Sequence, residues 1–162
     1  MSHTFKKSQS LFAPVSALSR EIDDAIVALY RDYKVDGVRP RFSMALIGLN
    51  DHGPMTIRDL AAFTRVTHGA MSQSVKAMKA ANMVETQTGR DARSVLVDLS
   101  DKGRAVITFL EAEWDATEAM LAELDADLPY PLTRVMADVR ERLDRESLRD
   151  RIARYMRSRQ SK

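Results

Sequence analysis

The chain has 162 residues, of which 44% are hydrophobic and 30% charged, and it contains no cysteine. This length and composition suit one compact domain or a small two-lobed protein, and they argue against disorder. The lack of cysteine excludes disulfides, thiolate metal sites and cysteine-based redox switches.

The net charge of +2 is too small to indicate a polyanionic partner, but the charges are unevenly distributed. Residues 111–127 carry seven acidic side chains and no basic one, whereas residues 55–93 carry six basic and three acidic side chains. Residues 140–162 hold nine basic and four acidic side chains. The chain has no apolar run of about eighteen residues and no apolar stretch at its start. We therefore expect a cytoplasmic protein without membrane contact.

The first predicted element is a helix. Its apolar positions are spaced by three or four residues, at Leu11, Val15, Leu18, Ile22, Ile26 and Leu29. Gly37 and Pro40 interrupt this pattern. A short second helix is predicted over 41–49, followed by a turn over 50–54, and its inward-facing side chains are Phe42, Ala45, Leu46 and Leu49.

Two short helices joined by a tight turn are predicted next, over 57–63 and 67–81. Thr56 and Thr67 are expected to cap them, because a threonine hydroxyl can accept a hydrogen bond from the first helical turn. Asn82 follows the second helix, where a positive φ is favoured. On one side of that helix lie Met71, Val75 and Met78, and largely on the other lie His68, Gly69, Ser72, Gln73 and Lys76.

Strands are predicted over 83–86 and 95–99, joined by a charged loop over 88–94. A helix with a small, polar outer face fits a major groove, which is about 12 Å wide. A hairpin that carries arginine can reach the adjacent backbone or minor groove. The helix and the hairpin together therefore indicate sequence-specific binding of double-stranded DNA.

A long helix is predicted from residue 100 to its stop at 128–131, with a stripe of Val106, Leu110, Trp114, Thr117, Leu121 and Leu124. One final helix follows, with Leu132, Val135, Val139, Leu143, Leu148, Ile152 and Tyr155 on one side. A small domain cannot bury the apolar faces of the first helix and both of these, so we expect a homodimer. The predicted organisation is a helical dimerisation lobe (8–36 and 104–157) and a DNA-binding domain (41–103).

Over roughly residues 41–107 the chain resembles MarR-type regulators. The motifs are Asp59-Leu60-Ala61, Val66-Thr67, Ser72, Met83-Val84-Glu85, Asp91-Ala92-Arg93 and Leu99-Ser100-Asp101-Lys102-Gly103. The resemblance implies a mainly α fold with a small β-wing: a winged helix-turn-helix domain with N- and C-terminal dimerisation helices. It also implies a dimeric transcription factor, usually a repressor. We expect such a dimer to bind a pseudo-palindromic operator. Such regulators are often released from DNA by a small aromatic effector.

Three positions depart from the pattern of the resembled family. Asn82 replaces a glycine, which the conformational tolerance of asparagine allows. Ser74 stands where an aliphatic residue is usual, which predicts looser packing under the 67–81 helix, the recognition helix of the helix-turn-helix. Thr64 replaces a common leucine. None of these changes removes a charge from the wing or from the groove-facing side of the helix.

The predicted DNA contacts begin on the recognition helix. Gln73 can pair with adenine through two hydrogen bonds, and Ser72 can reach a base edge or a phosphate. Thr67 and His68 lie at the helix start, where the helix dipole favours phosphate. The alternatives are a solvated polar face, a simple N-cap at Thr67 and an ordinary solvated histidine.

Further contacts are predicted for lysines and for the wing. Lys76 and Lys79 are expected to meet backbone phosphates, which position a protein without reading sequence. The resemblance implies that Arg93 enters the minor groove while Asp91 holds it, and Arg90 is a second contact. The alternative for the wing is a surface Asp–Arg pair worth at most about 1 kcal/mol.

Nothing in the sequence favours an enzyme or a bound cofactor. There is no Ser/His/acid order or phosphate-binding glycine loop, and the three histidines share no metal-ligand spacing. The resemblance places an effector site near Phe42 and Trp114, although core packing is the commoner role of such residues. The alternative function is a winged-helix protein that binds a ligand or a protein partner without binding an operator.

Overall fold

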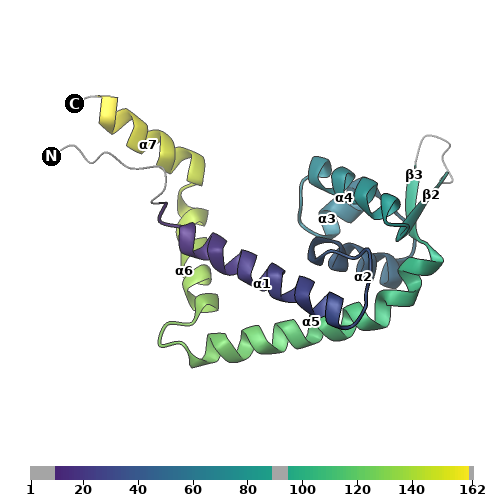
Figure 1. Ribbon diagram of the computed structural model, residues 1–162. Helices are drawn as coiled ribbons and strands as arrows, with labels where there is room; N and C mark the ends of the chain where they lie inside the picture. The colour runs from purple at the N-terminus through teal and green to yellow at the C-terminus, as the bar shows by residue number, and fades with distance from the viewer. Residues whose placement is uncertain (1–9, 89–94, 161–162) are drawn as a thin grey trace. The chain divides into compact units, whose positions relative to one another are not determined.

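The computed structural model describes residues 10–88 and 95–160 (Figure 1). The chain divides into two compact units, of which the first ends at Trp114 and the second begins at Asp115. Helix α5 (Asp101–Asp127) contributes to both. The other helices of the first unit are α1 (Ala13–Asp32), η1 (Pro40–Phe42), α2 (Ser43–His52), α3 (Ile57–Phe63) and α4 (His68–Ala80).

A three-stranded antiparallel sheet completes the first unit, in the order β1-β3-β2. Its strands are β1 (Met55–Thr56), β2 (Val84–Thr88) and β3 (Val95–Leu99). The hairpin of β2 and β3 confirms the predicted wing strands, but β1 was not predicted. Met55 of β1 lies opposite Val97, about forty residues later in the sequence. Two residues carry no periodic pattern, so only this distant pairing makes them a strand.

The core of the first unit lies between α2, α3, α4, α5 and the sheet. Its largest fully buried side chains are Phe42, Leu46, Leu49, Leu60, Met78, Met83, Val97, Leu99 and Leu110. The predicted inward face of α2 is confirmed, because Ala45 is also buried. Helix α2 continues beyond its predicted end to His52, and Gly53 then adopts a φ of 74°.

Side-chain caps fix the starts of the two short helices. The Thr56 hydroxyl accepts a hydrogen bond from the Asp59 amide at 3.1 Å, and Thr67 accepts one from the Ala70 amide at 3.2 Å. After α4, Asn82 has the expected positive φ, of 59°. These local predictions are therefore confirmed.

The buried face of α5 in the first unit differs from the prediction. It comprises Gly103, Ile107, Leu110 and Glu113, whereas Trp114 is 37% exposed. Gly103 sets this face, because a Cβ at that position would lie 2.1 Å from the carbonyl oxygen of Met83. The buried face thus shares Leu110 with the predicted stripe, but has Ile107 in place of Val106 and Glu113 in place of Trp114.

A buried polar cluster joins α1, α2 and α5 in the first unit. The Tyr30 hydroxyl donates to Oε2 of Glu113 at 3.1 Å and lies 2.8 Å from the Ser43 hydroxyl. Since the single Tyr30 proton goes to Glu113, Ser43 is the donor in the second contact. Burial raises the pKa of Tyr30 well above its ordinary value, so the hydroxyl keeps its proton.

The second unit contains the end of α5 and the helices α6 (Leu132–Arg145) and α7 (Leu148–Gln160). The prediction of one final helix was wrong, because the chain is extended at Glu146. Ser147 then caps α7: its hydroxyl accepts from the Asp150 amide at 3.2 Å and donates to the Asp150 carboxylate at 2.7 Å. The continuous apolar stripe concealed this break.

The Glu146 carboxylate reinforces the start of α7. It accepts two hydrogen bonds from the Arg154 guanidinium, at 3.1 and 3.0 Å. No residue of α6 is buried, and the exposed apolar side chains of α6 and α7 include Leu132, Val135, Met136, Val139, Leu148, Ile152, Tyr155 and Met156. Among the described helices, none has the length and apolar character needed to cross a bilayer.

Candidate nucleic-acid interface

Helix α4 separates an apolar face from a polar one. Met71, Val75 and Met78 are buried in the core of the first unit. On the outer side, the side chains of Ser72, Gln73 and Lys76 are exposed, and each is free of hydrogen bonds and ion pairs in the described part of the chain. This face can therefore offer donors and acceptors to a ligand without first breaking an internal contact. His68 and Gly69 are exposed on the same helix.

Lys79 is more constrained than a solvated lysine. Its ammonium donates a hydrogen bond to the Thr86 hydroxyl at 2.8 Å, which joins α4 to strand β2. An ammonium has three protons, so two remain for other acceptors. Lys79 of α4 therefore places its ammonium at the base of the wing, where one cation can contact a ligand bound to the helix or to the hairpin.

The end of α4 is held by the beginning of α5. Ser100 donates its hydroxyl proton to the carbonyl of Asn82 at 2.6 Å and accepts from the Gly103 amide at 3.1 Å. The Lys102 ammonium donates to the Ala81 carbonyl at 3.3 Å. These bonds satisfy carbonyls that a helix end leaves unpaired. They fix the position of α4 relative to the first turn of α5.

The turn between α3 and α4 is equally well defined. Arg65 has a φ of 56°, and the Val66 amide donates to the Ala61 carbonyl at 3.0 Å. The Thr64 hydroxyl donates to the Leu60 carbonyl at 2.8 Å. Threonine at this position therefore adds a hydrogen bond where a leucine would add apolar contact.

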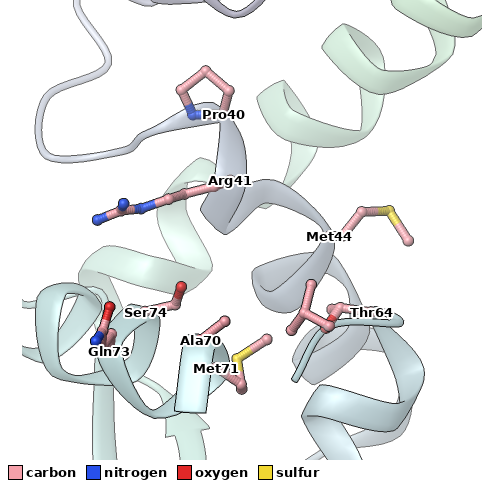
Figure 2. Close-up of a pocket in the computed structure, with 9 residues that line it drawn as sticks. Pro40, Arg41, Met44, Thr64, Ala70, Met71, Gln73 and Ser74 are labelled. Atoms are coloured by element: carbon pink, nitrogen blue, oxygen red, sulfur yellow. The ribbon is translucent and has the colours of Figure 1, made fainter. Parts of the chain in front are cut away.

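A pocket of about 370 Å³ opens beside α4, between η1, α2 and the α3–α4 turn (Figure 2). Both smaller residues noted in the sequence, Thr64 and Ser74, line it. The rest of its lining is Pro40, Arg41, Met44, Val66, Ala70, Met71 and Gln73. The floor is thus mostly apolar, and Figure 2 shows Arg41, Gln73 and Ser74 on one side of the pocket and Thr64 on the other.

Arg41 was missed by the sequence analysis. Its guanidinium carbon lies 5.4 Å from the centroid of the Phe42 ring, and its side chain is exposed. The sequence signal was an arginine at the start of the predicted 41–49 helix. Gln73 lies 32 positions later in the sequence, so only the fold shows that Arg41 and Gln73 line the same pocket.

The wing residues Arg90, Asp91 and Arg93 lie outside the described residues. The strands on either side are described, and Thr88 pairs with Val95 at the end of the β2–β3 hairpin. The predicted roles of the three residues therefore stay predictions. The described part of the interface consists of α4, the α3–α4 turn and the base of the hairpin.

The residues predicted for an effector site occupy different surroundings. Phe42 is only 1% exposed and belongs to the core, although its edge lines a second pocket with Gly37, Val38, Arg39, Ala77, Ala80 and Ala81. Trp114 is partly exposed on α5. In the described residues, no group of three His, Asp or Glu side chains is arranged to hold a metal ion.

Comparison with known proteins gives a family match and many related folds. Residues 37–94 match the model of the MarR family. None of the curated proteins matches the chain. A crystal structure of a MarR family transcriptional regulator from Silicibacter pomeroyi is similar, with 28% identity and a TM-score of 0.53. That comparison covers 85% of this chain and 95% of the other.

Two structures of DNA complexes share the fold. MepR of S. aureus has 14% identity and a TM-score of 0.64, over 84% of this chain and 97% of its own. MOSR of M. tuberculosis has 19% identity and a TM-score of 0.58, over 86% of this chain and all of its own. At these identities the likeness is one of fold, and it confirms the predicted mainly helical architecture with a small wing.

Proposed function

We propose that this chain, whose residues 37–94 match the model of the MarR family, is a transcriptional regulator of that family that represses transcription as a homodimer on a pseudo-palindromic operator. The observation that carries the proposal is the outer face of α4. There the side chains of Ser72, Gln73 and Lys76 are exposed and unengaged, while Met71, Val75 and Met78 anchor the helix from behind. A helix that is anchored through its apolar face and exposes its polar face can enter a major groove.

Different parts of the interface have different tasks in this proposal. Ser72 and Gln73 read base edges, while Lys76, Lys79 and the start of α4 at Thr67 and His68 bind phosphates. The wing residues contact the flanking groove and backbone, through Arg90, Asp91 and Arg93.

The proposed dimer is supported by apolar surface in each unit. In the first unit, Leu11, Phe12 and Val15 are all more than half exposed, at and before the start of α1. In the second unit, α6 and α7 expose the apolar residues named above. Large apolar surfaces on a helix are usually covered by a partner. We assign dimerisation to residues 8–36 and 104–157, and DNA binding to 41–103.

A small aromatic effector is the proposed signal. If it binds more tightly to the DNA-free dimer than to the DNA-bound one, it weakens operator binding by the same factor by which DNA weakens effector binding. Phe42 and Trp114 are the residues proposed for this site. A thermal shift with a panel of aromatic acids and phenols, compared between the wild type and Trp114→Ala, tests the assignment.

The main test is selection of bound fragments from the source genome, followed by fluorescence anisotropy titrations on the selected operator and on an unrelated duplex. We expect a steep salt dependence, in which each neutralised phosphate adds about 0.9 to the slope of log affinity against log salt. Gln73→Ala should lower affinity for the operator by about 1–3 kcal/mol and spare the unrelated duplex. Lys76→Ala should weaken binding to both equally.

Light scattering of the same preparation should give the mass of a dimer. A shallow salt slope, or a dimer that selects no fragment yet binds a metabolite tightly, would contradict the proposal. The second result would favour a winged-helix module that binds a ligand or a protein partner without an operator.

A further inference from the structure

We propose that Arg41 is an additional DNA contact, whose guanidinium binds a backbone phosphate on the side of α4 that has no lysine. This inference rests on the proposed function, because it requires that α4 enters a groove. It adds a residue from η1 to an interface otherwise built from α4 and the wing.

The cations of α4 lie on one side of Gln73. At about 100° per residue, Ser72 and Lys76 fall to one side of Gln73, and Ala70 and Ser74 fall to the other. Lys79 lies further round on the first side, where its ammonium bonds to Thr86 of β2. A helix in a major groove has a phosphate backbone along each side, so the side of Ala70 and Ser74 lacks a positive charge of its own.

Arg41 lies on that uncharged side. It lines the same pocket as Ala70, Gln73 and Ser74. Figure 2 shows its side chain extending from η1 toward the edge of the pocket where Gln73 and Ser74 lie. A cation from another element therefore stands where α4 has none.

The guanidinium of Arg41 is available and oriented. It is exposed, and in the described residues it has neither a carboxylate nor a hydrogen-bond partner. It stacks at 5.4 Å from the ring centroid of Phe42, whose own side chain is fixed in the core. Pro40 starts η1, and the Phe42 amide donates to the Arg39 carbonyl at 2.8 Å, which holds the backbone on either side.

These features fit a phosphate better than a base edge. A guanidinium can donate two parallel hydrogen bonds to phosphate oxygens, and holding it in place before binding reduces the entropy lost on contact. The pocket floor under Arg41 offers Met44, Val66 and Ala70, which make no directional hydrogen bond through their side chains. The contact we infer is therefore independent of DNA sequence.

The test compares Arg41→Gln with the wild type on the selected operator and on an unrelated duplex, at several salt concentrations. Glutamine keeps a side chain over Phe42 but removes the charge. We expect about tenfold weaker binding to both duplexes and a salt slope smaller by about 0.9. Arg41→Lys should retain the slope.

Urea unfolding of each variant checks that the fold is intact, and Lys76→Ala serves as the reference for a phosphate contact. If Lys76→Ala lowers the slope while Arg41→Gln keeps the affinity and the slope of the wild type, the role of Arg41 is refuted and the proposed function stands. A loss confined to the operator, with an unchanged slope, would also refute a phosphate contact. If the wild type binds no duplex, the proposed function and this inference both fail.

Discussion

The two units of the chain bury their apolar side chains to very different extents. The first unit encloses a core in which Leu46, Leu60, Met78 and Leu110 are fully buried. In the second unit, α6 buries no residue, and α6 and α7 expose eight large apolar side chains. The first unit is therefore stabilised mainly by its own packing. The second unit is stabilised by helix caps and ion pairs, and by any partner that covers its apolar side chains.

The largest effect should come from the close backbone contact in the first unit. Gly103→Ala adds a Cβ that would lie only 2.1 Å from the carbonyl oxygen of Met83. Because a backbone atom cannot rotate away, we expect a loss of about 4 kcal/mol or more in the free energy of unfolding. Urea titration followed by circular dichroism measures it.

Gly69→Ala is the matched control, because a Cβ at Gly69 meets nothing within 4 Å. Alanine is a better helix former than glycine by about 1 kcal/mol, so this variant should be equally or more stable than the wild type. Similar stability of the two variants would show that α5 does not approach Met83 as closely as described.

A second prediction compares a buried methionine of the first unit with an exposed methionine of the second. Met78→Ala should destabilise the protein by about 3 kcal/mol, because a fully buried side chain is replaced by a cavity. Met136→Ala, at a side chain that is 62% exposed on α6, should change stability by less than about 0.5 kcal/mol in dilute protein. Unfolding measured over a range of protein concentrations would separate these effects. A large loss for Met136→Ala that grows with concentration would place Met136 in a dimer contact.

The smallest predicted effect is a pH dependence at the start of α7. The hydrogen bond from Arg154 lowers the pKa of Glu146 below its ordinary value. A carboxylate with a lowered folded pKa stabilises the fold above its unfolded pKa, and this contribution is lost as pH falls through the folded pKa. The NMR titration of Glu146 should therefore have its midpoint below that of an ordinary glutamate.

Arg154→Gln should move the Glu146 midpoint upward, whereas Arg149→Gln should leave it in place. Arg149 is the appropriate control because its contact is with Asp150 at 3.8 Å. An unchanged midpoint in Arg154→Gln would show that the hydrogen bond does not form in solution.

Local signals in the sequence were sufficient for the helix-turn-helix. The caps at Thr56 and Thr67 and the positive φ at Asn82 each depend on a few neighbouring residues, and the structure has all three. At α7, the same kind of signal was overlooked, because Ser147 and Asp150 form a cap inside an apparently continuous apolar stripe.

The remaining differences depend on contacts between distant parts of the chain. Strand β1 exists through its pairing with β3, and the face of α5 is set by Gly103 meeting Met83. The position of Arg41 beside Gln73 likewise follows from how η1 packs near α4. Neither periodicity nor composition indicates such contacts between distant residues. This is why the sequence did not predict that Arg41 belongs to the candidate interface.

The joint between α4 and α5 limits which changes in chain length this domain can accept. Ser100, Lys102 and Gly103 each meet a different backbone group within three consecutive residues, 81–83. One residue inserted between Ser100 and Gly103 would rotate everything after it by about 100°. The Ser100 hydroxyl and the Lys102 ammonium could then no longer reach their carbonyl partners while Gly103 lies against Met83. Insertions and deletions should therefore be absent from 99–103 in functional descendants of this chain, even where individual side chains there are exchanged.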